Sequence, residues 1–267
     1  MAAKKRKKKA AAAGKKHGRK FWKVTGWVVG GFFLFTILLT LAYRWINPPI
    51  TPLMVIRSLE GEARVKEWKP LEEISTAMPR AAVASEDNRF CGHNGFDFSA
   101  IQRAVDHNKV YSKKIGASTI SQQTAKNVFL WPGRSWVRKG FEVYFTFLIE
   151  KLWGKERIME VYLNVIEMGH GIYGAEEAAQ HYFHCSAKKL NAHQAALITA
   201  CYPNPRRWNP AAPTPYIRRR AANIQSLMPK MGPIKYDKES LKKARERYRK
   251  AEERRIAKND GKRLKLK

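Results

Sequence analysis

Two short stretches carry most of the information in this chain: SEDNRFCGHNGFD at residues 85–97 and GASTISQQTAKN at residues 116–127. Both are rich in polar and ionisable side chains and show little of the apolar periodicity of packing segments. The first contains the adjacent carboxylates Glu86 and Asp87, with His93 close behind. This density of reactive groups indicates a site of catalysis or binding.

The carboxylate pair can be interpreted in two ways. Adjacent acids near a helix end are common, and for an arbitrary pair a structural role is the better interpretation. Here Phe90 and Phe96 place apolar surface around the pair. Such surface removes water from a carboxylate and favours its protonated form, which allows proton exchange near neutral pH. The context therefore favours a general acid or base.

The second stretch predicts the start of a helix. Thr119 and Gln122 have the spacing of a capping box, which accounts for both residues structurally. It leaves other polar residues unexplained, namely Ser118, Gln123 and Lys126. Cations follow downstream: Arg134, Arg138 and Lys139. Because a helix start attracts anions and Arg binds two phosphate oxygens at once, a phosphate site and a plain helix cap are equally supported.

Glu142 opens an otherwise apolar helical segment. An acid in a first helical turn interacts well with the helix dipole, so a structural role is a sound interpretation. Beside so many cations it could instead orient Lys126 or Arg134, or bind a divalent cation that bridges to phosphate. The aromatic loop around Trp131 and Trp136 either rests in a membrane interface or forms half-buried core.

A transmembrane helix is predicted before the two stretches, over residues 24–45. Residues 24–43 contain no charge, and at about 1.5 Å per residue a helix of that length crosses the hydrocarbon core of a bilayer. Aromatic residues near both ends favour the membrane interface. A buried helix of a large soluble protein is the alternative. A cleaved signal peptide would have a shorter apolar region and a small-residue cleavage site.

The termini hold most of the net charge of +30. Residues 1–23 carry eleven Lys/Arg and no acid, whereas residues 235–267 carry fifteen Lys/Arg against six Asp/Glu. Lys-rich segments beside a span stay in the cytoplasm, so we expect residues 1–23 there and the later domain outside the cytoplasmic (inner) membrane, in the periplasm or at the cell exterior. We expect anionic lipid rather than nucleic acid as the partner of such clusters.

The 267 residues suffice for one domain of ordinary size with extensions at both ends. We expect a Pro-rich linker at residues 46–52, a domain over residues 53–234, and a basic tail at residues 235–267 that is helical and then disordered. Apolar spacing predicts a mainly α fold with helical segments at residues 98–105, 141–165 with a break at Gly154, 187–202 and 217–228. Strand signals are confined to MVIRSLEGEARV, residues 54–65.

The cysteines Cys91, Cys185 and Cys201 are too few and odd in number for a disulfide framework, so free thiols are expected. His181, His184 and Cys185 have loose metal-ligand spacing. A lone cluster without a second pair of ligands is weak evidence for zinc, so structural histidines are expected.

Four motifs follow one another along the chain: EDNRFCGHNGFD at 86–97, GASTISQQTAKN at 116–127, RKGFE at 138–142 and KERIMEVYLN at 155–164. In this order and spacing they resemble the successive motifs of the family-51 peptidoglycan glycosyltransferases, over roughly residues 53–230. The membrane span and the single domain resemble the monofunctional biosynthetic transglycosylases of that family. The resemblance implies a lysozyme-like lobe with a smaller membrane-associated jaw. It also implies polymerisation of lipid II in cell wall biogenesis, and thus a role in cell shape.

The resemblance also implies a role for each motif residue. Glu86, assisted by Asp87, would deprotonate the 4-hydroxyl of the acceptor sugar, which attacks the donor anomeric carbon with inversion while undecaprenyl pyrophosphate leaves. Lys126 and Arg134 would neutralise the pyrophosphate. Glu142 would steady these cations or bind Mg²⁺ or Mn²⁺, and no organic cofactor is expected. The donor site would be shaped by Ser118, Thr119, Gln122, Gln123 and Asn127, and the further motif residues are Phe90, His93, Gly95, Arg138 and Lys139.

Two other functions explain less of the sequence. A lytic enzyme that cleaves finished peptidoglycan would share the lobe and a single acid, but it gives no task to Lys126, Arg134 and Glu142. A membrane-tethered basic scaffold would explain the termini only. The expected partners are lipid II, the growing lipid-linked glycan, the membrane, and proteins of cell-wall synthesis and division. His184 and Cys185 stand where related chains often have Gly-Lys, which puts a local turn in doubt.

Overall fold

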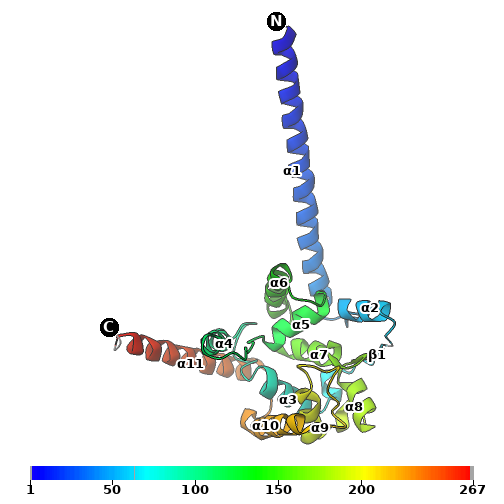
Figure 1. Ribbon diagram of the computed structural model, residues 1–267, viewed down its shortest axis with the longest axis vertical. Coiled ribbons are helices and arrows are strands. Elements are labelled where there is room, and N and C mark those ends of the chain that lie inside the picture. Colours follow the sequence, from blue (N-terminus) through cyan, green and yellow to red (C-terminus); the bar gives the residue numbers. More distant parts are fainter. Residues whose placement is uncertain (1, 63, 265–267) are drawn as a thin grey trace. The chain divides into compact units, whose positions relative to one another are not determined.

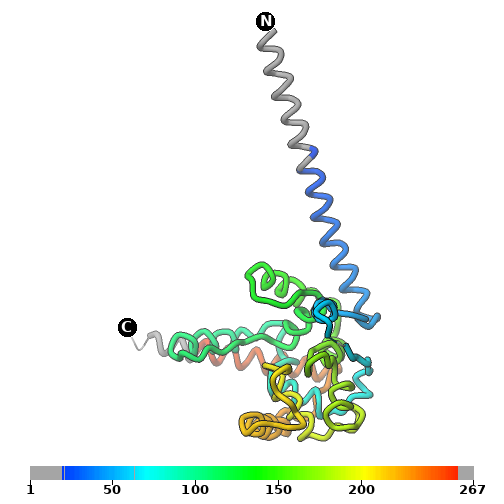
Figure 2. Tube along the Cα trace, turned by 45° about the vertical axis from the view of Figure 1, so that its right-hand side comes forward, coloured from blue at the N-terminus to red at the C-terminus, as the bar shows by residue number. Residues whose placement is uncertain are grey.

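The computed structural model describes residues 2–62 and 64–264, with side chains at residue 20 and at residues 22–62 and 64–257 (Figure 1). The chain forms two compact units, Met1–Trp45 and Ile46–Lys267, which are described separately. Helices dominate both units, so the predicted mainly α fold is confirmed (Figure 2).

The first unit is a single helix, α1 (Ala2–Ala42). Residues Trp22–Ala42 have a mean hydropathy of 2.0 and are, within the described part of the chain, the one helical stretch long and apolar enough to cross a membrane. Two hydroxyls of this stretch bond to the helix itself: Thr36 Oγ1 donates to Phe33 O at 2.9 Å and Thr40 Oγ1 to Thr36 O at 2.7 Å. The polar side chains therefore remain satisfied where no water is available.

The second unit contains ten α-helices in its described part: α2 (Pro52–Leu59), α3 (Ala77–Glu86), α4 (Phe98–Val110), α5 (Ile120–Phe129), α6 (Trp136–Leu152), α7 (Lys155–Val165), α8 (Ala175–Phe183), α9 (Ala192–Ala200), α10 (Pro215–Met231) and α11 (Lys238–Leu264). Two 3-10 turns, η1 (Leu71–Glu73) and η2 (Ala187–Lys189), complete its helical structure. α3 packs against α9 and α10, and α5 packs against α6 and α7 (Figure 1). α7 is almost entirely buried, which places it at the centre of the core.

Three short strands form one small sheet in the order β1-β3-β2. β1 (Val65–Lys66) runs parallel to β3 (Ile172–Tyr173), and β2 (Glu167–Gly169) runs antiparallel to β3. The predicted β segment at residues 54–65 is wrong except at its end. Thr51 caps a helix there by accepting the Met54 N–H at 3.3 Å, and Pro52 occupies its first turn, so most of the segment becomes α2. β2 and β3 are too short to show an alternating pattern in sequence.

Local signals located the starts of α4, α5 and α7, whereas α6 begins five residues before the predicted segment at 141, and α3 and α8 were not predicted. Asp97 caps α4 by accepting the Ala100 N–H at 2.9 Å, and α7 begins after the predicted break at Gly154. The single helical block predicted for residues 187–202 is wrong, because it divides into η2 and α9. Asn191 starts a new capping box with Gln194, and this restarts the helix in a new direction.

His184, at the end of α8, is the one non-glycine residue with positive φ in the described part of the chain, at 51°. Its N–H bonds to the carbonyls of Ala179 and Gln180, so the left-handed conformation closes the helix. Cys185 follows, and it forms no disulfide with Cys91 or Cys201, which are also free. His184, which stands where related chains often have Gly, thus lies at a position that favours Gly.

We expect His184→Gly to raise the free energy of unfolding by about 0.5–1 kcal/mol, because Gly enters the left-handed region without steric cost. The gain is reduced by the larger conformational freedom that Gly has in the unfolded chain. Thermal unfolding in detergent measures the change, and His184→Ala serves as the control that removes the side chain but keeps the strain. A lower stability of the Gly variant than of the Ala variant would contradict this explanation.

Candidate active site

Glu86 is the last residue of α3, and donors from three elements converge on its carboxylate. Ser85 Oγ donates to Oε1 at 2.8 Å, and Gln123 Nε2 of α5 donates to Oε2 at 3.0 Å. Arg220 Nη2 of α10 lies 3.4 Å from Oε1. The side chain nevertheless retains an exposed fraction of 17%. The carboxylate is therefore fixed in position and still open to a ligand.

The amide that faces Glu86 is itself oriented by the core. Gln123 Oε1 accepts from the hydroxyl of Tyr162, a buried residue of α7, at 3.2 Å. This bond directs the Gln123 NH₂ group towards Glu86. Burial raises the pKa of Tyr162 well above its usual value, so its hydroxyl remains a donor. Tyr162 and Arg220 were not predicted as site residues: the first follows an apolar helical pattern, and the second lies within an unremarkable run of arginines.

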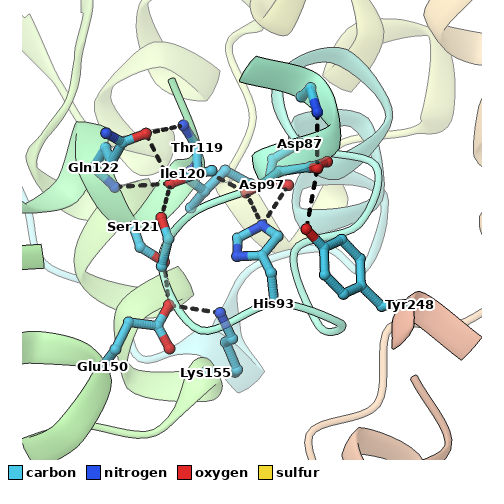
Figure 3. A network of polar contacts seen from close by, with 12 residues as sticks. Asp87, His93, Asp97, Thr119, Ile120, Ser121, Gln122, Glu150, Lys155 and Tyr248 are labelled. Carbon is cyan, nitrogen blue, oxygen red and sulfur yellow. Dashed lines mark hydrogen bonds and ion pairs between the residues drawn. The ribbon is translucent and has the colours of Figure 1, made fainter. Parts of the chain in front are cut away.

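Asp87 faces a different set of partners from Glu86. His93 Nε2 lies 2.9 Å from Oδ1 and 3.0 Å from Oδ2, and the Ile120 N–H donates to Oδ2 at 3.0 Å (Figure 3). Both Asp87 and His93 are buried. In this structure Asp87 joins the loop after α3 to the first residue of α5, and it shares no bonding partner with Glu86. These contacts support a positioning role for Asp87, and its expected assistance to Glu86 stays a prediction.

We expect Asp87→Ala to destabilise the protein strongly, because it leaves the Ile120 N–H and a His93 nitrogen buried without a partner. Each such group costs about 1–3 kcal/mol. Thermal unfolding in detergent measures the loss. Asp106→Ala is the matched control, since Asp106 is exposed on α4 and accepts only from the neighbouring Gln102. Equal melting temperatures for the two variants would contradict the role assigned to Asp87.

The predicted capping box at the start of α5 is confirmed. The Gln122 N–H donates to Thr119 Oγ1 at 3.2 Å, and the Thr119 N–H donates to Gln122 Oε1 at 3.1 Å (Figure 3). Thr119 Oγ1 also donates to Gly95 O at 2.6 Å, which ties the two motifs together. Gly95 has φ of +91°, and a Cβ atom there would lie 2.8 Å from Thr146 Cγ2, so only Gly fits. Thr119 and Gln122 are both buried, so their capping role is established, and their contact with the donor stays a prediction.

Glu142 is the buried centre of a cluster of cations. Its Oε2 lies 3.1 Å from Arg138 Nη1, and its Oε1 is in close contact with Lys139 Nζ. Both carboxylate oxygens are thus occupied by cations. Within the described residues no group of three His, Cys, Asp or Glu side chains could hold a metal ion. The two contacts support the alternative that Glu142 steadies cationic side chains, and a divalent cation that bridges Glu142 to phosphate stays a prediction.

Lys126 lies on α5 within the electrostatic field of this cluster. Burial lowers the pKa of Lys126, and the charges of Glu142 and Glu86 oppose that shift. The ammonium group makes no hydrogen bond or ion pair with any other residue that the structure describes. A desolvated cation without a protein partner is available to an anionic ligand.

The remaining predicted residues lie in loops or support the site. Ser118 and Arg134 are exposed, on the loops before and after α5, and no hydrogen bond or ion pair among the described residues holds either side chain in the site. Asn127 Nδ2 donates to Gln123 O at 2.8 Å, so it supports the helix that carries Gln123. Phe90 is buried, with Lys155 Nζ 4.4 Å from its ring centroid. The structure thus gathers Glu86, Gln123 and Lys126 and leaves Ser118 and Arg134 at the margin.

Known proteins resemble this chain across the whole site. The sequence family described as Transglycosylase matches residues 53–229. A biosynthetic peptidoglycan transglycosylase of Bdellovibrio bacteriovorus is 55% identical over 207 residues, which cover 74% of this chain and 83% of the relative. The protein of the same name from Bacteroides thetaiotaomicron is 52% identical over 228 residues, covering 82% and 92%. The chain therefore belongs to the transglycosylase family, whose domain is lysozyme-like, and it is a glycosyltransferase.

Proposed function

We propose that this transglycosylase polymerises lipid II, a lipid-linked disaccharide–peptide, into peptidoglycan strands. The names of the relatives, biosynthetic peptidoglycan transglycosylases, support this product. The observation that carries the proposal is a juxtaposition on α5: Gln123 holds the Glu86 carboxylate, and Lys126 presents an unpaired ammonium three residues later. Residues at this spacing share one face of a helix. The proton acceptor Glu86 and the anion-binding Lys126 therefore lie at the same face of α5.

In this mechanism Glu86 removes the proton from the 4-hydroxyl of the acceptor sugar. The oxygen attacks the anomeric carbon of the donor, and the bond from that carbon to the pyrophosphate oxygen breaks. Configuration at the carbon inverts, and the proton ends on Glu86. The three donors that fix the carboxylate reduce the cost of orienting it for this step.

Lys126 stabilises the negative charge that develops on the leaving pyrophosphate. A cation in a partly buried site acts more strongly on such a charge than one in water, because the local dielectric constant is lower. Glu142 holds Arg138 and Lys139 in the same region, and its charge favours the protonated form of Lys126. Arg134 and Ser118 reach the donor from their exposed loops. No metal ion takes part in this assignment.

Exposed apolar side chains support a substrate that stays in the membrane. They lie on α4, on α6 and in the loop before α6: Phe98, Ile101, Val105, Val110, Trp131, Trp136, Val137, Val143 and Phe147. Trp136 is 92% exposed. Exposed apolar groups in such number mark a surface that contacts lipid or protein. We assign it to the membrane-associated jaw, with α1 as the single-pass anchor, the N-terminus in the cytoplasm and the catalytic domain outside.

Polymer formation tests the proposal. Full-length protein in detergent, supplied with labelled lipid II, is expected to yield long glycan that is resolved by gel electrophoresis. The matched control is the same disaccharide–peptide without its lipid pyrophosphate, which lacks a leaving group and should give no polymer. Shortening of finished peptidoglycan without any polymer from lipid II would overturn the proposal in favour of a lytic enzyme, for which the cation cluster has no task.

A further inference from the structure

α11 lies beyond the part of the chain that matches the transglycosylase family, yet it contacts the catalytic motif directly. The Tyr248 hydroxyl donates to Asp97 Oδ1 at 3.3 Å (Figure 3). The ring of the same residue meets the His93 ring edge to face, with centroids 6.1 Å apart. Burial and the charge of Asp97 raise the pKa of Tyr248 to about 12, so the hydroxyl remains a donor at neutral pH.

The backbone of the motif is shaped to receive this helix. A Cβ atom at Gly92 would lie 2.9 Å from Tyr248 Cβ and 3.1 Å from Ala244 O. The second of these contacts involves main chain, which cannot rotate away as a flexible side chain can. The absence of a side chain at Gly92 therefore allows α11 to approach the loop closely.

An ion pair holds the same loop one turn further along α11. Arg89 Nη1 lies 3.3 Å from Glu252 Oε1, and the Arg89 guanidinium lies 5.7 Å from the Tyr248 ring centroid. Arg255 also pairs with Glu252, at 3.2 Å, and orients it. Every one of these contacts from α11 reaches a residue between Arg89 and Asp97. α11 therefore contacts this one loop at its start, in its middle and at its end.

The same segment of chain also contacts the start of α5, on which Gln123 and Lys126 lie. Asp87 and Gly95 hold the first turn of α5 through the Ile120 N–H and Thr119 Oγ1. α5 in turn carries Gln123, which holds Glu86. The loop therefore lies between α11 and the start of α5, and a displacement of the loop would be transmitted to the carboxylate through those bonds.

Apolar packing accounts for only part of the contact of α11, because its inward-facing residues Leu241, Ala244, Tyr248 and Ala251 are only half-buried. The helix is strongly charged, and a cavity of about 520 Å³ remains between it, α10 and the loop. A helix that served to complete the core would bury an apolar stripe and leave no such space. The polar contacts of α11 with the loop come from Tyr248 and Glu252.

We propose that α11 is a positioning element of the active site, and that Tyr248 and Glu252 act as positioning residues that hold the loop of residues 88–97 against the start of α5. This proposal rests on the proposed role of Glu86. In this proposal α11, which lies outside residues 53–229 of the family match, affects kcat.

Two variants of the contact and a matched control test this proposal in the full-length protein. Tyr248→Leu removes the hydroxyl and the ring, and Glu252→Gln removes the ion pair. Glu253→Gln is the control, since Glu253 is the next acid of the same helix and, among the side chains that the structure describes, pairs only with exposed Arg249. We expect Tyr248→Leu to lower kcat about 10-fold to 100-fold, the range for small misplacements of catalytic groups. KM and the melting temperature should stay close to the wild-type values, and Glu252→Gln should have a smaller effect of the same kind.

Hydrogen exchange supplies a readout that does not depend on the role of Glu86. In Tyr248→Leu, exchange should quicken at the amides of residues 88–97 and at Ile120, whereas Glu253→Gln should match wild type. Tyr248→Phe keeps the ring and removes only the hydroxyl bond to Asp97, so it should lower kcat a few-fold and quicken exchange in the loop. This variant supplies the test if the Leu variant does not fold. Unchanged exchange and unchanged kcat in the Tyr248 variants, or a parallel loss in Glu253→Gln, would overturn the proposal. If Glu86→Gln remained active while exchange in the loop responded as expected, only the assignment of the base would fail.

Discussion

Replacing Glu86 with Gln is expected to remove almost all polymer formation while the protein stays folded and still binds lipid II. Gln has nearly the same shape, and its amide can remain beside Ser85 and Gln123, but it cannot accept the proton of the acceptor hydroxyl. Loss of a general base typically lowers the rate by about 10²–10⁴-fold. Initial rates of polymerisation give kcat, and a titration with labelled lipid II gives the affinity.

Ser85→Ala is the matched control for this result. It removes one of the bonds that orient the Glu86 carboxylate, at 2.8 Å, and leaves the base in place. Its kcat is expected to fall only a few-fold, roughly the cost of one neutral hydrogen bond. Comparable losses in Ser85→Ala and Glu86→Gln, or turnover of Glu86→Gln near that of wild type, would show that Glu86 is not the base.

Replacing Lys126 with Met is expected to lower both donor affinity and kcat. Met keeps the apolar stem of the side chain and removes the charge that faces the pyrophosphate. Removal of one preorganised electrostatic group typically costs about 10²–10³-fold in kcat. Titration with a pyrophosphate-bearing lipid analogue measures the loss of affinity, and Lys242→Met, on the exposed side of α11, is the control. Unchanged affinity in Lys126→Met would contradict the role.

The same residue predicts the alkaline limit of activity. Because burial lowers the pKa of Lys126, the ammonium loses its proton at a lower pH than an ordinary Lys, whose pKa is about 10.5. The protonated form is the active one, so kcat/KM should decline as the pH rises through that lowered pKa. Lys126→Arg keeps its charge to higher pH and should move the decline upwards. An alkaline limb at the same pH in both proteins would exclude Lys126 as its source.

The sequence predicted those parts of the fold that depend on neighbouring residues. The Thr119–Gln122 capping box, the Asp97 cap and the break at Gly154 each involve residues within one helical turn, so spacing alone reveals them. Most of the β segment at residues 54–65 was wrong, because a local signal, Pro52 after Thr51, outweighed the apolar pattern, and only Val65 of the segment belongs to a strand.

The different contacts of Glu86 and Asp87 could not be predicted from neighbouring residues. Glu86 and Asp87 are adjacent in sequence, and their roles differ because their partners lie 37 and 33 residues away, at Gln123 and Ile120. Arg220 reaches Glu86 across 134 residues, and no local pattern marks it. Such contacts depend on how α3, α5 and α10 pack, which a single sequence does not express as periodicity.

The anomeric configuration of the product tests the central claim most directly. Wild-type enzyme is supplied with lipid II of known donor configuration, and the new glycosidic bond in the polymer is analysed by NMR. If Glu86 acts as a base in a single displacement, every new bond has the inverted configuration, and one undecaprenyl pyrophosphate is released for each bond formed. Retained configuration would mean that a side chain attacks the donor as a nucleophile, and it would contradict the account.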